Sequence, residues 1–159
     1  MNKGLKKPKI YLAGGIQGLS YADANAWRLK VTELLKPEIE TINPLTKENM
    51  IIKLLWEGKG MPKKESSIES YPPWACNYIV WKDLKEIKSS SGILVYLPKN
   101  VQRPYFGTSM EIFYTSYVLK RPVFVFGDSK NRSPWINSFC IALTDTMEEA
   151  VTLIKGVLL

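Results

Sequence analysis

The sequence predicts a small doubly wound α/β sandwich built on a mainly parallel sheet of four or five strands. Short apolar strand patterns alternate with longer helix patterns along the chain, the order that builds β-α-β units. The runs at Ile93–Leu97 and Pro122–Phe126 are continuously apolar, as expected of strands covered on both faces. A length of 159 residues, 45% of them hydrophobic, suits one domain with a substantial core.

A β-α-β unit opens the chain. Lys9–Ala13 (KIYLA) and Ile39–Ile42 (IETI) are typical of strands, and apolar residues at helical spacing predict a helix over Ala22–Leu35 between them. Ser20 is the expected N-cap of that helix, and Pro37 ends it. Such a unit favours parallel pairing of the two strands.

The rest of the chain divides into an irregular segment and a regular second half. Residues 45–73 are rich in Gly, Pro, Lys and Ser, which predicts an insertion with one short helix near residues 48–56. It is either a functional lid or a plain surface excursion. Four more helices are expected, over Pro73–Lys88, Thr108–Leu119, Pro134–Ala142 and Thr146–Val157. Thr146 and Glu149 fit a capping box. We expect residues 1–159 to form a single domain.

The composition excludes several kinds of site. The chain has no histidine, which excludes imidazole bases and imidazole metal ligands. Cys76 and Cys140 form neither a disulfide framework nor a zinc motif, so we expect no metal and no cofactor. No apolar run reaches the roughly 18 residues of a membrane span, and the N-terminus lacks a signal sequence. We therefore expect a cytoplasmic protein.

The formal net charge is +7. This charge is either solvated surface or a basic field that attracts anionic ligands such as nucleotides. The chain contains no helix-turn-helix, zinc-finger or aromatic RNA-binding motif, so we do not expect a nucleic-acid partner.

Candidate ligand-binding residues follow the expected strands. Parallel α/β sheets bind ligands at their carboxyl edge, where Gly14 and Gly15 follow the first strand and Asn43 follows the second. The segment Ala13–Gly18, which includes Gln17, resembles a dinucleotide fingerprint with alanine in its first place. It is equally a tight turn, and the late helix start near Ser20 argues against a pyrophosphate site.

Glu111 has two interpretations. With Thr108 it fits a capping box, in which the carboxylate binds its own helix. Gly107 and Ser109 instead leave room for a ligand at the helix start. Asp83 precedes the neighbouring strand and is either solvated or turned toward the same crevice. Two carboxylates in one crevice are the minimum set for glycosidic chemistry.

Five segments of the chain, taken in order and spacing, resemble the nucleoside 2-deoxyribosyltransferase family. They are Ile10-Tyr11-Leu12-Ala13-Gly14, Asp83-Leu84-x-x-Ile87-Lys88, Tyr96-Leu97-Pro98, Gly107-Thr108-Ser109-Met110-Glu111-Ile112 and Lys120-Arg121-Pro122-Val123. The superfamily also includes nucleoside 5'-monophosphate N-glycosidases. The match runs from Ile10 to about Val125.

The resemblance implies a flavodoxin-like three-layer sandwich and cleavage of the bond between a nucleobase and its sugar. It makes Glu111 the nucleophile that forms a glycosyl-enzyme ester. Tyr11 would orient Glu111, and Asp83 would contact the base and manage its proton. A second base or water would resolve the intermediate, giving a transferase or a hydrolase.

The sequence departs from the family at the expected 5' end of the substrate. Family transferases carry an acid six residues before the nucleophile and the monophosphate hydrolases carry serine, whereas this chain has Tyr105. Arg103 could meet a phosphate. Members of the family often complete the pocket with a polar residue from near the C-terminus of a neighbouring subunit, and the resemblance gives Asn137 that part. It therefore implies a homodimer or higher homo-oligomer. A non-catalytic nucleotide-binding or sensing module and a dinucleotide-binding protein remain the alternatives.

Overall fold

The computed structural model describes residues 6–15, 21–46, 73–98, 106–127 and 133–159. Five strands form one parallel sheet in the order β2-β1-β3-β4-β5, which is the flavodoxin-like order. The strands are β1 (Lys9–Gly14), β2 (Glu40–Ile42), β3 (Gly92–Leu97), β4 (Val123–Gly127) and β5 (Ala142–Thr144). The predicted fold class is confirmed.

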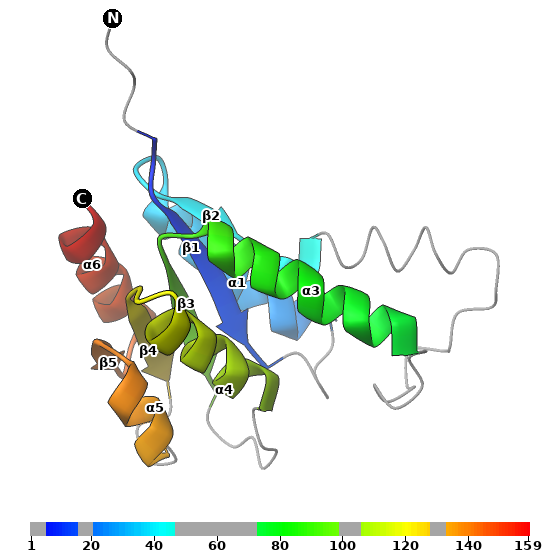
Figure 1. Ribbon diagram of the computed structural model, residues 1–159. Helices are drawn as coiled ribbons and strands as arrows, with labels where there is room; N and C mark the ends of the chain where they lie inside the picture. Colours follow the sequence, from blue (N-terminus) through cyan, green and yellow to red (C-terminus); the bar gives the residue numbers. More distant parts are fainter. Residues whose placement is uncertain (1–5, 16–20, 47–72, 99–105, 128–132) are drawn as a thin grey trace, which may run out of the picture.

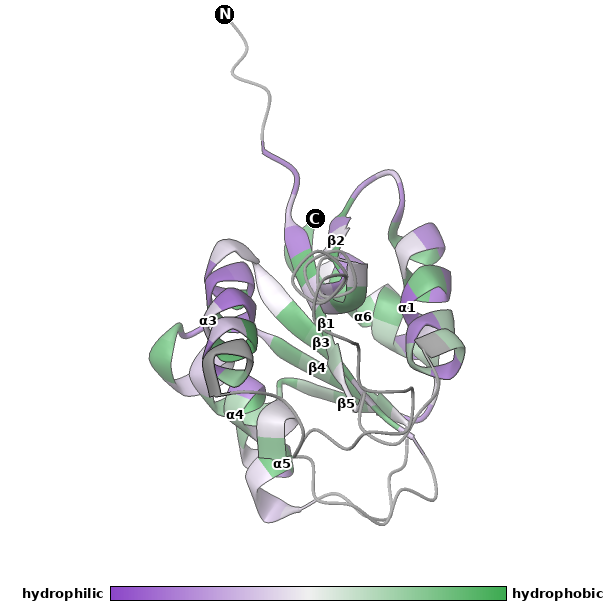
Figure 2. Cartoon of the chain, turned by 90° about the vertical axis from the view of Figure 1, so that its right-hand side faces the viewer, coloured by the Kyte–Doolittle hydropathy of each residue, from purple (hydrophilic) through white to green (hydrophobic). Residues whose placement is uncertain are grey.

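Helices cover both faces of this sheet (Figures 1 and 2). On one face lie α1 (Tyr21–Leu35) and α6 (Met147–Leu158). On the other lie α3 (Pro73–Ser89), α4 (Phe106–Phe113) and α5 (Pro134–Phe139). The helix after β1 and the helix after β3 therefore cover opposite faces, which places the topological switch point between these two strands.

The strand residues alternate between the two cores, as the pleat requires. Ile10 and Leu12 of β1 pack under α1 and α6. Tyr11 and Ala13 pack under α3, α4 and α5. Tyr11 therefore lies on the face that also carries the helices of Asp83 and Glu111.

The helices α1, α3 and α6 agree with the sequence patterns. The helix α1 ends at Leu35, just before Pro37, and α3 begins at Pro73. The capping box of α6 is present, with Glu149 N donating to Thr146 Oγ1 and Thr146 N donating to Glu149 Oε2, each at 3.3 Å. The proposed N-cap Ser20 lies outside the described residues.

The helix that carries Glu111 differs from its prediction. It already includes Phe106, so Thr108 lies inside α4 and is not its N-cap. After α4 the chain continues as a π-helical segment, η2 (Tyr114–Val118), in which Leu119 N donates to Tyr114 O. Lys120 then adopts φ 54° and ends the helix. The capping-box interpretation of Glu111 is wrong in its geometry, because its partner is helical.

The predicted helix over Pro134–Ala142 is too long. Helix α5 ends at Phe139, and Cys140 at its C-cap is extended. Ile141 N then donates to Val123 O, and Ala142 enters β5 beside β4. Pairing with the sheet overrides the helical pattern of this segment.

The expected insertion lies almost wholly outside the described residues, which omit 47–72. The single-domain prediction over residues 1–159 therefore stays a prediction. Among the described residues, no helix is long and apolar enough to cross a membrane.

Candidate active site

A tyrosine and a glutamate meet in the layer between the sheet and the helices α3 and α4. Both helices contact β1, and Tyr11 of β1 is fully buried beneath them. Its hydroxyl donates to Glu111 Oε1 at 3.0 Å. Glu111 is half-buried, so a buried tyrosine holds an acid that is still partly exposed to solvent.

Asp83 completes the group from α3. Its side chain is 19% exposed, and the Tyr11 hydroxyl makes a hydrogen bond with it. Glu111 and Asp83 therefore contact the same hydroxyl. The fold brings together the three residues that the sequence nominated for catalysis.

Burial raises the pKa of Asp83 above its ordinary value. The ammonium of Lys82 and the Tyr11 hydroxyl oppose this shift, whereas the carboxylate of Glu86 adds to it. A tyrosine hydroxyl has one proton and can donate to only one carboxylate at a time. When Tyr11 donates to Glu111, it therefore cannot donate to Asp83 in the same moment.

Three solved structures are similar to the chain over most of its length. The 2-deoxyribosyltransferase from Bacillus psychrosaccharolyticus matches with a TM-score of 0.63 and 17% identity, over 90% of each chain. The 2-desoxiribosyltransferase from Leishmania mexicana matches with a TM-score of 0.59 and 15% identity, over 96% of this chain and 99% of the other. The chain shares the fold of the 2-deoxyribosyltransferases.

A conserved protein from Enterococcus faecalis V583 has this fold too, with a TM-score of 0.60 and 18% identity, over 96% of this chain and all of the other. No protein-family model and no curated protein matches the chain by sequence.

The turn after β1 is shaped by a buried arginine that the sequence analysis missed. Arg28 of α1 is fully buried and donates to the carbonyls of Leu12 at 3.2 Å, Gly14 at 3.1 Å and Ala24. A Cβ on Gly14 would lie 3.0 Å from the Tyr96 carbonyl oxygen, so glycine permits this close approach. An arginine within the apolar stripe of its helix was the available signal.

Asn43 lies at the end of β2, as expected, but both polar ends of its side chain have protein partners. Its Nδ2 donates to Asn25 Oδ1 at 2.7 Å, and its Oδ1 accepts from Leu45 N at 3.1 Å. Asn43 thereby fixes the turn after β2.

The remaining nominated residues fall into three groups. Gly107 and Ser109 are exposed near the start of α4, and a Cβ placed on Gly107 would meet no described residue within 4 Å apart from its chain neighbours and the backbone of its own helix. Asn137 is exposed on α5. Gly15 is half-buried beyond β1, and Gln17, Arg103 and Tyr105 lie outside the described residues.

Sequence analysis also missed the ions beside Asp83. Lys82 and Glu86 are buried on α3, and their i, i+4 spacing was the visible signal of an ion pair. Within the described part of the chain, no cluster of three or more acidic or cysteine side chains is placed to hold a metal ion.

Proposed function

We propose that the protein cleaves the N-glycosidic bond of a deoxynucleoside, a nucleoside or its 5'-monophosphate. The proposal rests on the Tyr11–Glu111 hydrogen bond of 3.0 Å with Asp83 on the same hydroxyl. An oriented carboxylate and a second, protonated carboxyl group form the pair that retaining glycosyl transfer needs. The 2-deoxyribosyltransferase-like fold supports the same chemistry.

In the first step, one carboxylate oxygen of Glu111 attacks C1' of the sugar. The bond between C1' and the base nitrogen breaks, and its electron pair leaves with the base. Asp83 gives its proton to the departing base, which keeps that base from leaving as an anion. The product is a glycosyl ester of Glu111 and a free, neutral base.

In the second step, water or another base attacks C1' from the opposite side. The ester bond between C1' and Glu111 breaks and restores the carboxylate. The proton lost by the incoming water or base returns to Asp83. Water gives hydrolysis, and a base gives transfer. Every proton and bond is then back in its starting place on the protein.

Burial and hydrogen bonding favour catalysis over a sensing module. A site that only binds has no need of a carboxyl group with a raised pKa, and such groups gather at catalytic centres. Arg103 and Tyr105 are proposed to bind the 5' group of the substrate. Gly14, Gly15, Gln17, Asn43, Gly107 and Ser109 are proposed to line the sugar and base.

The deciding experiment mixes the protein with deoxynucleosides and their monophosphates, with and without an acceptor base. Chromatography should detect free base if water is the acceptor, or a new nucleoside if a base is. A 2'-deoxy-2'-fluoroarabinosyl nucleoside should add its sugar mass to the wild-type protein, and peptide mapping should place it on Glu111. Tight binding without base release or adduct would favour the sensing module.

Substitution of the nucleophile provides the matched test. Glu111→Gln and Glu111→Ala should reduce base release by at least about 10⁴-fold and should not form the sugar adduct, while circular dichroism shows a retained fold. Glu33→Gln, which alters an exposed acid on α1, should keep full activity. Wild-type turnover in Glu111→Ala would refute the assignment.

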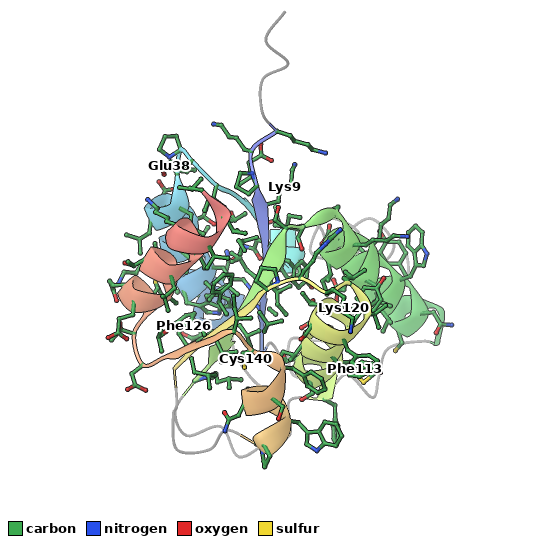
Figure 3. All side chains as sticks on the ribbon, turned by 60° about the vertical axis from the view of Figure 1, so that its left-hand side comes forward. Lys9, Glu38, Phe113, Lys120, Phe126 and Cys140 are labelled. Atoms are coloured by element: carbon green, nitrogen blue, oxygen red, sulfur yellow. The ribbon has the colours of Figure 1, made fainter. Side chains whose placement is uncertain are left out.

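We also propose that the protein works as a homodimer or larger assembly. An apolar face lies on α4, η2 and α5, and we define it by Phe106, Met110, Phe113, Tyr117, Trp135 and Phe139. Its rings stack in two pairs. The ring centroids of Phe113 and Tyr117 lie 5.1 Å apart, and those of Trp135 and Phe139 lie 6.1 Å apart. Figure 3 shows Phe113 on the outer side of α4 beside α5. Exposed apolar faces of this kind are typical of subunit contacts. Asn137 lies on α5, which carries part of this face, and would approach a partner subunit from there.

A further inference from the structure

A buried ion cluster adjoins Asp83 on α3. Lys82 is 5% exposed, and its Nζ lies 2.9 Å from Asp83 Oδ1 and 3.7 Å from Glu86 Oε2. The contact with Asp83 is an ion pair and not a well-aligned hydrogen bond. The same ammonium donates to the carbonyl of Pro44 at 3.1 Å. Lys82 therefore fixes Asp83 relative to the backbone that follows β2.

The charges of this cluster suit an aspartate that loses and regains a proton. A buried ammonium requires a counter-charge, and Glu86 on the next turn of α3 supplies it whether or not Asp83 is ionised. With Asp83 protonated, Lys82 and Glu86 form a neutral pair. With Asp83 ionised, the same ammonium also stabilises the new negative charge. The cluster is neutral when Asp83 is protonated and carries one net negative charge when Asp83 is ionised, with the ammonium beside that charge.

We propose that Lys82 and Glu86 are positioning residues that set the pH range in which Asp83 exchanges its proton with the nucleobase. This inference deepens the proposed function and rests on it for the identity of the proton acceptor. Among the described residues, the groups that face Asp83 are Tyr11 from β1 and Lys82 and Glu86 from α3, with Glu111 of α4 acting through Tyr11.

The two positioning residues act in opposite directions. The Lys82 ammonium lowers the pKa of Asp83, and the Glu86 carboxylate raises it. Because Asp83 must be protonated to assist departure of the base, activity falls as the pH rises through this pKa. Lys82→Met should therefore move the basic limb of the kcat/KM profile to higher pH, and Glu86→Gln should move it to lower pH. A role in folding alone would move neither limb in this paired way.

The experiment measures kcat/KM for base release between pH 4 and pH 9 in wild type, Lys82→Met and Glu86→Gln. Lys82→Arg keeps the charge and should keep the wild-type limb. Lys85→Met removes an exposed lysine of the same helix, whose ammonium lies over Trp81, and should leave the profile unchanged. The inference is overturned if the basic limb of the pH profile stays in place in Lys82→Met and Glu86→Gln, or if it moves in the same direction in both.

A second readout does not depend on turnover. The side-chain carboxyl carbon of Asp83, assigned by comparison with Asp83→Asn, is titrated by ¹³C NMR in the ligand-free protein. Opposite shifts of its midpoint in Lys82→Met and Glu86→Gln uphold the cluster even if no nucleoside is cleaved, in which case only the proposed function fails. Unmoved midpoints in an active enzyme overturn the cluster and leave the proposed function standing.

Discussion

At the residue scale, the Tyr11 hydroxyl connects two carboxyl groups. Tyr11 is fully buried and its hydroxyl serves both Glu111 and Asp83. Packing on all sides fixes the ring, so the hydroxyl can orient an acid without a loss of side-chain freedom in each turnover. A second tyrosine with an exposed ring, Tyr117 on η2, offers a control of the same chemistry.

Tyr11→Phe should keep the fold and lower kcat by about 100-fold, because one donor to the reacting carboxylate is lost. Its cost in unfolding free energy should be about 1 kcal/mol, the usual net value of one hydrogen bond. Tyr117→Phe should change neither quantity. Steady-state kinetics and urea denaturation measure both. An unchanged kcat in Tyr11→Phe would remove Tyr11 from the mechanism.

Asp83 should make stability depend on pH in a defined direction. Its pKa is raised in the folded state, so the folded chain holds this proton more tightly than the unfolded chain. The stabilisation by protonated Asp83 is complete below the unfolded pKa of about 3.9 and is lost as the pH rises through the folded pKa. Asp83→Asn, which imitates the protonated form, should therefore gain stability over wild type as the pH rises across this window.

Urea denaturation from pH 4 to pH 8 measures how much the unfolding free energy of Asp83→Asn exceeds that of the wild type. Glu148→Gln is the control of opposite sign, because a hydrogen bond from Lys30 lowers the pKa of that exposed acid. A gain for Asp83→Asn that is equal at every pH would contradict the assignment. A more stable and less active Asp83→Asn is the usual relation between stability and a catalytic group.

The sequence could nominate Glu111, Asp83 and Tyr11 because they occupy ordered motifs, but it could not place them. Their meeting depends on α3 and α4 lying over the same strand, which is a property of the whole sheet. Asn43 was nominated by its place after a strand, yet its amide is bound to Asn25 and Leu45. Arg28 was missed because a lone arginine in a helix pattern usually lies in solvent.

At the element scale, one arginine joins the end of α3 to the start of β4. The guanidinium of Arg121 donates to the carbonyls of Ile87 at 3.2 Å, Lys88 at 2.7 Å and Ser90. These are carbonyls at the C-terminus of α3, where cations are favoured by the helix dipole. Arg121 thus joins the C-terminus of α3, the helix that carries Asp83, to the residues before β4.

Arg121→Met should lower the unfolding free energy by about 1–3 kcal/mol, because three carbonyls lose a charged donor. All three bonds come from Nη1. Arg121→Lys keeps the charge but not the planar guanidinium that places this nitrogen, and we expect it to recover only part of the loss. Lys120→Met alters the neighbouring exposed lysine and is the matched control. Urea denaturation at one pH compares the three variants. Equal stability in Arg121→Met and wild type would show that the contacts contribute nothing.

The sequence patterns located most elements because apolar periodicity and proline positions are local signals. The strands β3 and β4 and the helices α1, α3 and α6 agree with them closely. The short strand β5 could not be predicted, since Ala142–Thr144 has no strand pattern and is extended only through its pairing with β4. The π-helical η2 also had no local signal.

At the scale of the whole molecule, the apolar face on α4, η2 and α5 predicts self-association. Light scattering after size exclusion should give a dimer or larger species for the wild type. Met110→Lys and Trp135→Lys, at side chains that are 65% and 72% exposed, should shift the protein toward the monomer because a charge is costly in an apolar contact. Leu29→Lys, at an exposed apolar residue of α1 on the opposite face, should not.

A monomeric wild type at all concentrations would contradict this prediction. Mixing would test Asn137 in the same assembly. An inactive Glu111→Gln subunit and an inactive Asn137→Ala subunit should together regain activity if each site takes its asparagine from the partner.

The sheet of the described residues ends on both sides in strands of three residues, β2 and β5. Such stubs offer few unpaired amide and carbonyl groups to an incoming chain, so they are poor templates for strand addition and for fibrils. The long, strongly apolar strands are enclosed in the middle, where no neighbour can reach them. In the described part of the chain, the helices therefore offer more surface for contact between copies than the sheet edges do, and crowding in the cell should favour discrete particles over extended β-aggregates.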